Sequence, residues 1–307
     1  MEKAVALQFQ LAGRPLWRIH RTLRTVSYSL DEALADVPPQ PSRAGADGYL
    51  FRSLPVTHVP LIRQRMAGWL VAARQHYPRH YVAMAGRDFD QWWAGFSGRT
   101  RSTLSRKARR LADHLGGTLS IQAYRSVEEV DRFMALAAPL SRRTYQERLL
   151  QAGLPRSAAA VARAMEAAAR DDVRAFLLFA GERPIAYLYL PVRDDVLIYA
   201  HLGYDPDFAG SSPGTVLHVE AMRQLFAERR FRHFDFTEGD GAHKALFGRG
   251  SVACADLLVL RPSWGNRLAL GSLQAFDAAA AGAKRLLTRC GPAARVVSTI
   301  RRRMRQG

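Results

Sequence analysis

Cysteine is scarce in this sequence, which holds only Cys254 and Cys290 among 307 residues. The two are far apart and form neither a Cys-x-x-Cys pair nor a zinc-ligand spacing, so neither a metal site nor a disulfide framework is indicated. His76 and His80 stand four residues apart, but the sequence places no carboxylate or third ligand near them. We therefore expect a protein without a metal, in a reducing compartment.

Long apolar runs are also lacking. The stretch 174–192 is interrupted by the polar turn 181–184, and the stretch after Leu268 contains Asp277. Neither supplies the ~20 uninterrupted apolar residues of a membrane-spanning helix. The first residues show no apolar segment followed by a cleavage site, which a signal peptide would have. The sequence thus predicts a cytoplasmic protein, either soluble or peripheral at the inner membrane.

Acidic residues are few, since 27 Asp and Glu stand against 45 Lys and Arg, for a formal charge of +18. The excess is uneven: residues 261–307 hold 10 basic residues and 1 acidic residue, whereas residues 101–260 hold 22 and 19. A basic tail fits an anionic partner, such as nucleic acid, an acidic polymer or an anionic membrane surface contacted by residues 264–307. A solvated tail is the alternative reading of the same charges.

What is present favours an α/β (α+β) fold. Hydrophobic periodicity predicts helices near residues 61–74, 88–96, 97–115, 127–140, 155–169, 215–229 and 264–305. Alternating patterns predict strands at residues 16–26, 81–85, 118–124, 173–180, 185–192, 196–204, 231–237 and 251–260. The three strands between 173 and 204 follow one another through short polar turns, so they form an antiparallel meander. This order indicates a mixed sheet flanked by helices.

Three stretches resemble one branch of the GNAT acyltransferase superfamily. The first, FSGRTRSTLSRKARRLADHLGG, is similar to a basic helix that enters the family's acyltransferase domain. The second, YDPDFAGSSPGTVLHVEAM, is similar to the family's strand, loop and helix start. The third, FDFTEGDGAHKALFG, resembles its acidic-glycine turn and aromatic–lysine pair, with His243 in the place of the aromatic residue. The branch contains the cellulose-biosynthesis-type acyltransferases and the Fem-type peptidoglycan aminoacyl transferases.

The resemblance implies a fold, a domain order and a reaction. It implies a GNAT-like mixed, mostly antiparallel central sheet in residues 97–262, a partial or reduced GNAT-like lobe in residues 1–96, and a basic helical tail in residues 263–307. It also implies direct acyl transfer in a ternary complex, from acyl-CoA or acyl carrier protein to an amine or hydroxyl of a sugar, lipid or envelope-related acceptor. No activated Ser or Cys is then needed, and the sequence has no Gly-x-Ser-x-Gly elbow.

The thioester carrier is expected at a loop of small residues before the helix 215–229. Small side chains let backbone N–H groups approach a pyrophosphate, and the helix start adds the positive end of its dipole. An ordinary turn and helix start is the alternative. The predicted carrier-binding residues are Gly210, Ser211, Ser212, Pro213, Gly214 and Thr215.

The general base is expected in the turn after the strand 231–237. Glu238, Asp240 and His243 are the candidates, because clustered carboxylates can raise one carboxyl pKa toward a useful range and a histidine can accept a proton. The alternative is a plain polar turn, in which Asp and Gly are common for conformational reasons.

Four further residues are candidates for the site. Tyr199 could protonate the leaving thiolate, and the two-residue period of a strand would place it on the same face as His201. His201, Lys244 and Arg106 could bind the substrate, Lys244 as a point charge and Arg106 from the basic helix. For each of them an ordinary packing or surface role is the alternative.

Two other functions remain open. A nucleic-acid-binding protein fits the charge, although no nucleic-acid-binding motif is present. Its narrower form is a tRNA-dependent aminoacyl transferase, because Fem-type relatives take aminoacyl groups from tRNA. The other is a non-catalytic basic binding module built on an acyltransferase fold. Salt-dependent tRNA binding would favour the former, and binding to anionic liposomes without any thioester carrier would favour the latter.

Overall fold

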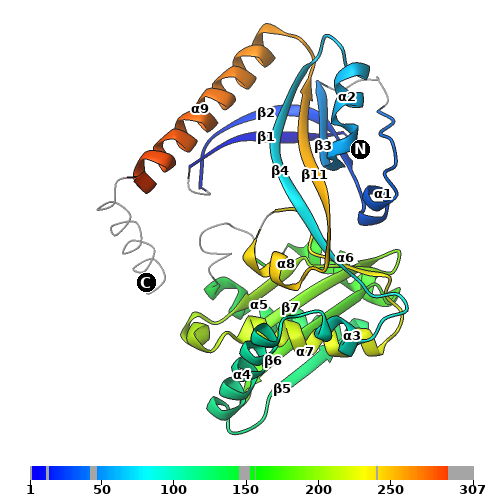
Figure 1. Ribbon diagram of the computed structural model, residues 1–307, viewed down its shortest axis with the longest axis vertical. Coiled ribbons are helices and arrows are strands. Elements are labelled where there is room, and N and C mark those ends of the chain that lie inside the picture. Colours follow the sequence, from blue (N-terminus) through cyan, green and yellow to red (C-terminus); the bar gives the residue numbers. More distant parts are fainter. Residues whose placement is uncertain are drawn as a thin grey trace. The chain divides into compact units, whose positions relative to one another are not determined.

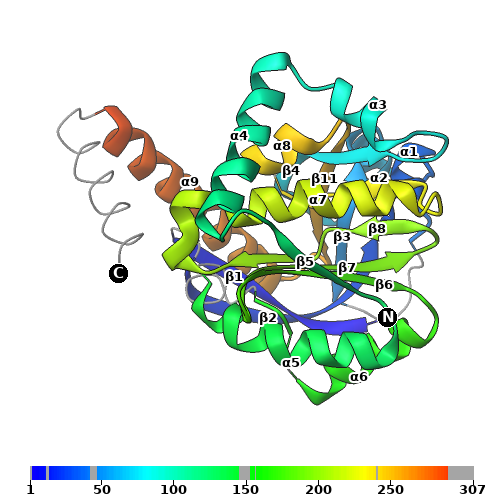
Figure 2. The same cartoon turned by 90° about the horizontal axis from the view of Figure 1, so that it is seen from below.

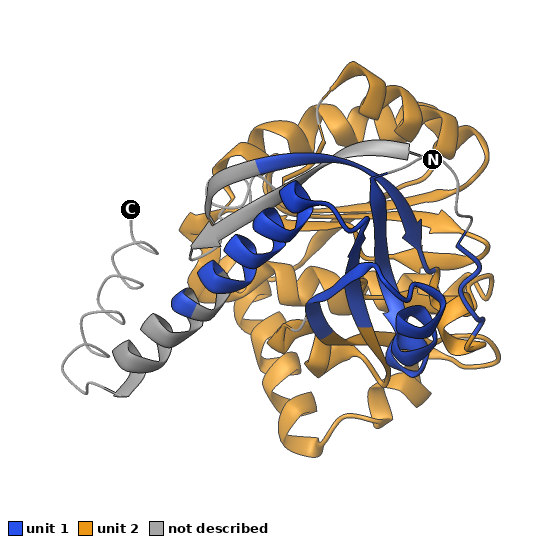
Figure 3. Ribbon diagram, turned by 90° about the horizontal axis from the view of Figure 1, so that it is seen from above, with its two compact units in different colours: residues 1–28, 37–76, 255–307 blue, residues 29–36, 77–254 orange. Residues whose placement is uncertain are grey.

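The computed structural model describes residues 2–11, 14–41, 47–144, 153–155, 157–239 and 241–289. The chain divides into two compact units: residues 1–28, 37–76 and 255–307, and residues 29–36 and 77–254 (Figure 3). These units differ from the three consecutive segments expected from the sequence, because strands β4 (Leu70–Ala83) and β11 (Gly250–Leu260) each supply residues to both units. The part of the tail from residue 290 onward lies outside the described residues.

The first unit is built on strands from both ends of the chain. β1 (Glu2–Leu11) pairs antiparallel with β2 (Arg14–Ser27), and β3 (Gly48–Pro55) pairs parallel with β2. The unit also contains a 3-10 turn (Val56–His58), α2 (Val59–Arg65) and α9 (Trp264–Arg289) (Figure 1). Tyr49, Phe51 and Leu257 lie in its core.

The prediction of one helix in this unit is partly wrong. The helix expected near residues 61–74 ends at Arg65, and β4 begins at Leu70. Gly68 adopts a positive φ of 84° between them, a backbone conformation that glycine adopts without steric cost and that ends the helix. The Ala- and Leu-containing segment after it pairs as a strand, so tertiary pairing overrides its helical propensity.

The second unit contains a mixed sheet. Its strands follow the order β4, β10, β8, β7, β6, β5, and β9 pairs with β7 beside this path. The pairs among these strands are antiparallel except for β8 with β10, which is parallel. The predicted mixed, mostly antiparallel sheet is therefore confirmed. The bounds are β5 (Ser120–Tyr124), β6 (Val173–Ala180), β7 (Arg183–Arg193), β8 (Val196–Ile198), β9 (His201–Tyr204) and β10 (His233–Asp235).

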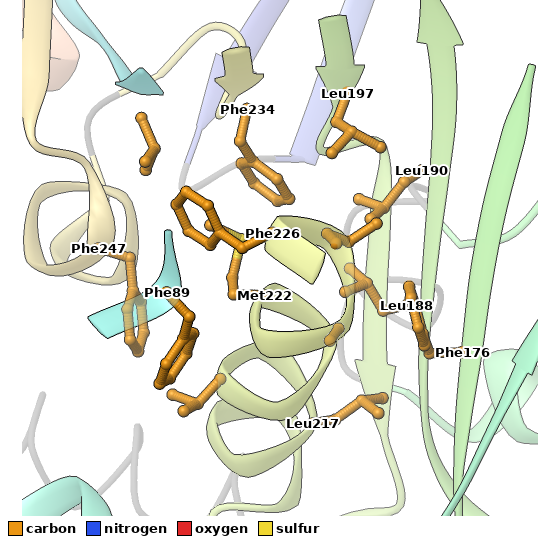
Figure 4. Packing of buried hydrophobic residues seen from close by; sticks show 14 of the residues in the cluster. Phe89, Phe176, Leu188, Leu190, Leu197, Leu217, Met222, Phe226, Phe234 and Phe247 are labelled. Carbon is orange, nitrogen blue, oxygen red and sulfur yellow. The ribbon is translucent and has the colours of Figure 1, made fainter. Parts of the chain in front are cut away.

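Helices cover both faces of this sheet. In Figure 2, α4 and α7 lie on one face and α5 and α6 on the other. Figure 4 shows the core under α7, where Leu217, Met222 and Phe226 pack against Leu188 and Phe234 of the strands. The bounds are α1 (Leu30–Leu34), α3 (Phe89–Ala94), α4 (Gly98–His114), α5 (Val127–Arg143), α6 (Ala158–Ala169), α7 (Pro213–Ala227) and α8 (Ala242–Phe247). No helix in the described part of the chain is long and apolar enough to cross a membrane.

Candidate active site

Strands β8 and β10 part at one end, and the candidate site lies there. Ile198 of β8 is opposite Asp235 of β10, and the amide of Tyr199 donates to the Asp235 carbonyl at 2.9 Å. Two residues later β9 begins, and it pairs with β7, where His201 is opposite Tyr189. Residues 196–198 thus lie beside residues 233–235, and the chain then leaves this partner to pair with β7.

Tyr199 and His201 do not share a face, so that prediction is wrong. The ring of Tyr199 packs with residues of the α7 face, including Phe234. His201 packs against Tyr189, which belongs to the core under α5 and α6. The chain is irregular at Tyr199 and Ala200, between β8 and β9, and this interruption breaks the two-residue alternation. His201 therefore lies on the other side of the sheet from Tyr199 and His243.

An aromatic–histidine cluster lies where the strands part. Its members are Tyr199, His218, Phe234, Phe236, His243 and Phe247. The ring of His243 stacks on Tyr199, with centroids 5.7 Å apart, and lies 5.1 Å from the ring of His218. Four elements supply these rings: the β8–β9 junction, α7, the end of β10 and α8. Two candidates from separate parts of the sequence, Tyr199 and His243, are thus brought together.

The turn after β10 is strained and braced. Thr237 has a φ of 61°, in the left-handed region that a β-branched residue rarely adopts. Its amide donates to Asp235 Oδ1 at 2.8 Å. Arg79 of β4 holds the same carboxylate through two hydrogen bonds of 3.1 and 2.6 Å, and both side chains are nearly inaccessible to solvent. A buried ion pair therefore fixes the turn that carries Glu238. Asp240, another candidate base, lies outside the described residues.

The expected carrier loop forms a 3-10 turn (Pro206–Ser211) followed by the start of α7. Pro213 has no amide hydrogen, and the amides of Thr215 and Val216 both donate to the Ser212 carbonyl. Ser212 adopts a left-handed conformation, and its side chain makes no capping hydrogen bond. Gly214 lies close to β9, because a Cβ there would be 3.0 Å from Leu202 Cδ2. The close packing of α7 on β9 is therefore enough to explain a glycine at this position, with or without a ligand.

A pocket of about 210 Å³ opens between α4 and α7, next to this loop. Thr215, the last residue of the predicted carrier loop, lines it together with Ser105, Arg109 and Arg223. Arg109 of α4 and the N-terminal turn of α7 favour an anion here, whereas Glu220, which pairs with Arg223 at 3.5 Å, also lines the pocket.

A family model for the acetyltransferase (GNAT) domain matches residues 98–245. The chain carries a GNAT acetyltransferase domain. The resemblance seen in the sequence is thereby confirmed, and with it the expectation of a GNAT-type acyltransferase. The match contains every member of the aromatic–histidine cluster except Phe247.

Solved structures share this fold. The chain is similar to FemX at 11% identity and a TM-score of 0.50, over 84% of this chain and 88% of that one. It is also similar to the C-terminal domain of a putative lysylphosphatidylglycerol synthetase from Agrobacterium fabrum, at 14% identity and a TM-score of 0.48, over 73% and 70% of the two chains. L-PGS from Bacillus licheniformis matches at 13% identity and a TM-score of 0.45, over 73% and 71%. No curated protein sequence matches the chain.

The electrostatics of the site separate a proton acceptor from a hydrogen-bond donor. Burial, together with the charges of Lys244 and Lys107, lowers the pKa of His243 to about 4. Its imidazole is therefore neutral near pH 7 and can accept a proton. Burial raises the pKa of Tyr199 well above its ordinary value, so its phenol keeps its proton.

Two basic candidates, Lys244 and Arg106, lie on α8 and α4 of the GNAT domain. The Lys244 ammonium donates a hydrogen bond to the Glu238 carbonyl, which ties α8 to the turn, and burial lowers the pKa of this lysine. Arg106 of α4 is exposed, whereas its neighbour Lys107 is the residue whose charge acts on His243. Neighbouring residues of a helix point in different directions, so Arg106 and Lys107 lie on different faces of α4. The sequence alone did not show which of these faces is turned toward His243.

Three residues of the site were not singled out from the sequence: His218, Arg79 and Lys107. His218 carried a usable signal, because it is a polar residue on the core-facing stripe of a predicted helix, beside Val219 and Leu217. Arg79 carried none, since its partner Asp235 lies 156 residues away. No group of three or more potential metal ligands occurs among the described residues.

Proposed function

We propose that this GNAT-type enzyme moves an acyl group directly from a thioester carrier to an amine or hydroxyl, with His243 as the general base. The observation that carries the proposal is a neutral histidine stacked on Tyr199 where β8 and β10 part. The carrier lies along the loop of Gly210 to Thr215, and the acceptor approaches His243. Glu238, whose carbonyl holds Lys244, frames this side of the site.

The proposed reaction needs one group that takes up and returns a proton, and one hydrogen-bond donor. As the acceptor nitrogen or oxygen bonds to the thioester carbon, its proton passes to His243. The C–S bond then breaks, and the sulfur takes the electron pair and a proton from His243. The phenol of Tyr199 donates a hydrogen bond to the sulfur as its charge develops, which is open to it because it stays protonated. No covalent enzyme intermediate forms.

The donor and the acceptor are proposed by chemistry. Acyl-CoA is the first donor to test, and acyl carrier protein and aminoacyl-tRNA are the alternatives. The acceptor is proposed to be a sugar, lipid or envelope-related amine or hydroxyl. A peripheral position at the inner membrane through residues 264–307 is part of this proposal. Side chains beyond Phe276 in that segment are largely outside those described.

The first test is a thermal-shift screen with acetyl-CoA, a long-chain acyl-CoA, acyl carrier protein and aminoacyl-tRNA. A carrier that binds the folded state alone raises the unfolding temperature by mass action. The stabilising carrier is then used in a transfer assay that follows thiol release with a panel of amines and hydroxyl compounds. Stabilisation by none of the carriers would contradict the proposed function.

Charge at the carrier loop is expected to control donor binding. Gly210 is exposed and has open space around a Cβ, so substitution there leaves the packing intact. Gly210→Asp should raise the dissociation constant for acetyl-CoA about tenfold, or ~1.4 kcal/mol, through repulsion of the pyrophosphate. The neutral Gly210→Asn is the matched control. Calorimetry at low salt checks both, and equal affinities would remove the loop from the carrier site.

Gly214, another residue of the predicted carrier loop, is a poor position for this test. A bulky β-branched residue there would press on Leu202 and Tyr204 of β9, so it would disturb the junction of α7 with the sheet. A loss of binding could then come from the displaced strand rather than from the lost amide approach.

The rate of transfer is expected to stay constant as the pH is lowered, until the pH approaches 4. The pKa of His243 is lowered to about 4, with Lys244, Lys107, His218 and Tyr199 as the titratable groups around it. Below that value the imidazole is protonated and cannot act as a base, so kcat/KM should fall about tenfold per pH unit. Circular dichroism at each pH excludes unfolding as the cause. An acid limb near the ordinary histidine value of about 6.5 would contradict the assignment.

A further inference from the structure

His218 of α7 is a polar side chain in a largely apolar setting. It is fully buried, and its ring packs against Phe234, Phe236 and Phe247. Both of its ring nitrogens are inaccessible and have no hydrogen-bond partner among the described residues. A buried donor and acceptor without partners cost stability, so a phenylalanine of similar shape would suit the packing better. The position therefore holds a residue that packing alone does not require.

The polar groups that face His218 are those of the candidate site. Its ring lies 5.1 Å from His243 and 5.9 Å from Tyr199. Nε2 of His243 is also buried without a partner among the described residues. A centroid separation of 5.1 Å suits an N–H···N hydrogen bond, because each ring nitrogen lies about 1.2 Å from its centroid and the bond spans about 2.9 Å. The rings are inclined at 69° in the structure, so the bond forms when the two nitrogens turn toward each other.

We propose that His218 is a positioning residue, which accepts a hydrogen bond from Nε2–H of His243 and so holds His243 in the tautomer that can take a proton from the acceptor. This inference rests on the proposed function of His243 as the general base. With Nε2 carrying the hydrogen, Nδ1 is left with the lone pair that receives the proton. His218 would thus do, as a neutral group, what a carboxylate does when it orients a catalytic histidine.

The proton balance assigns each histidine one task. The acceptor's N–H or O–H bond breaks as its nitrogen or oxygen bonds to the thioester carbon, and the proton goes to Nδ1 of His243. The cationic imidazole then donates more strongly from Nε2 to His218. When the C–S bond breaks, the sulfur takes the electron pair and the proton from Nδ1. His218 exchanges no proton and remains neutral, as burial and the nearby His243 lower its own pKa.

Other charges act on this pair from two elements. Lys244 stands next to His243 in α8, and Lys107 reaches it from α4; both disfavour the imidazolium. No carboxylate is among the groups that shift the pKa of either histidine. A neutral acceptor is therefore the group that can orient His243 here without adding a charge to the apolar cluster.

The test compares His218→Phe with His218→Gln. Phenylalanine keeps the ring and removes the acceptor, whereas glutamine keeps an acceptor oxygen. Nitrogen-15 NMR of the histidine side chains, with the exposed His114 as internal reference, should show that His218→Phe lowers the pKa of His243 by about one unit and mixes its tautomers. His218→Gln should restore both. The unfolding temperature of His218→Phe should be unchanged or higher.

Turnover supplies the second readout. With the donor found by thermal shift, His218→Phe should lower kcat about tenfold and leave the KM for the donor unchanged, and His218→Gln should recover most of the rate. An unchanged tautomer and pKa of His243 in a folded His218→Phe protein would overturn the inference, and so would an unchanged kcat. The NMR readout needs no substrate. An inactive wild-type enzyme with the expected His243 shift would therefore contradict the proposed function and leave the histidine pair standing.

Discussion

Replacing His243 with phenylalanine is expected to lower turnover by about 100-fold or more, which is the scale of losing a general base. The phenylalanine ring keeps the stacking on Tyr199 and the contact with Phe247, whose centroids lie 5.7 and 4.7 Å from that of His243. The variant should therefore fold and bind acetyl-CoA with unchanged affinity, and the loss should appear in kcat. Steady-state kinetics and calorimetry measure the two quantities separately.

The matched control for this variant is Glu238→Gln in the neighbouring turn. The backbone carbonyl of Glu238 accepts a hydrogen bond from Lys244 and so holds the turn. Because the substitution changes only the side chain, the turn should stay in place. Its turnover should stay within a few-fold of wild type. A 100-fold loss in Glu238→Gln together with an active His243→Phe would transfer the role of base to the carboxylate.

Breaking the buried ion pair between Arg79 and Asp235 is expected to give the largest loss of stability. Both side chains are nearly inaccessible, and Asp235 also accepts the amide of the strained Thr237. Removing one partner leaves the other charge buried, so Asp235→Leu or Arg79→Met should each lower the free energy of unfolding by about 3–5 kcal/mol. Urea denaturation monitored by tryptophan fluorescence measures the change.

The double variant Arg79→Met with Asp235→Leu tests the cause. Because neither charge then remains buried, it should be more stable than either single variant, giving a coupling free energy in a double-mutant cycle. Additive losses would mean that the two side chains contribute by packing alone. The double variant should still lose turnover, since the amide of Thr237 then loses the carboxylate that braces the turn before His243.

The second unit was largely predictable from the sequence. The meander of β6, β7 and β8 follows from alternating apolar residues and short polar turns, and α4 and α5 follow from apolar stripes with Ser97 and Ser126 as caps. These signals are local, because a β-turn, a helix cap or the apolar face of a helix depends on residues that are close together in the sequence. The long strand β4 was recognised only over its last few residues.

The candidate site was predictable in part. The motif around residues 237–244 and the tyrosine of the meander pointed to Glu238, His243 and Tyr199, and the structure brings the last two into contact. His201 was misplaced because a two-residue irregularity after β8 reverses the alternation, and no residue type at Tyr199 or Ala200 announces it. Arg106 was preferred over Lys107 because the orientation of α4 depends on what it packs against.

The sequence by itself determined the class of fold, the acyltransferase family and the segments that carry its motifs. Each of these depends on local pattern or on resemblance along a continuous stretch. The tertiary structure alone decided which polar groups meet. His218 comes to lie 5.1 Å from His243, and Arg79 neutralises Asp235 across 156 residues of sequence. The physical reason is that burial and charge pairing, which set the pKa values and the strain of this site, arise only once distant elements pack together.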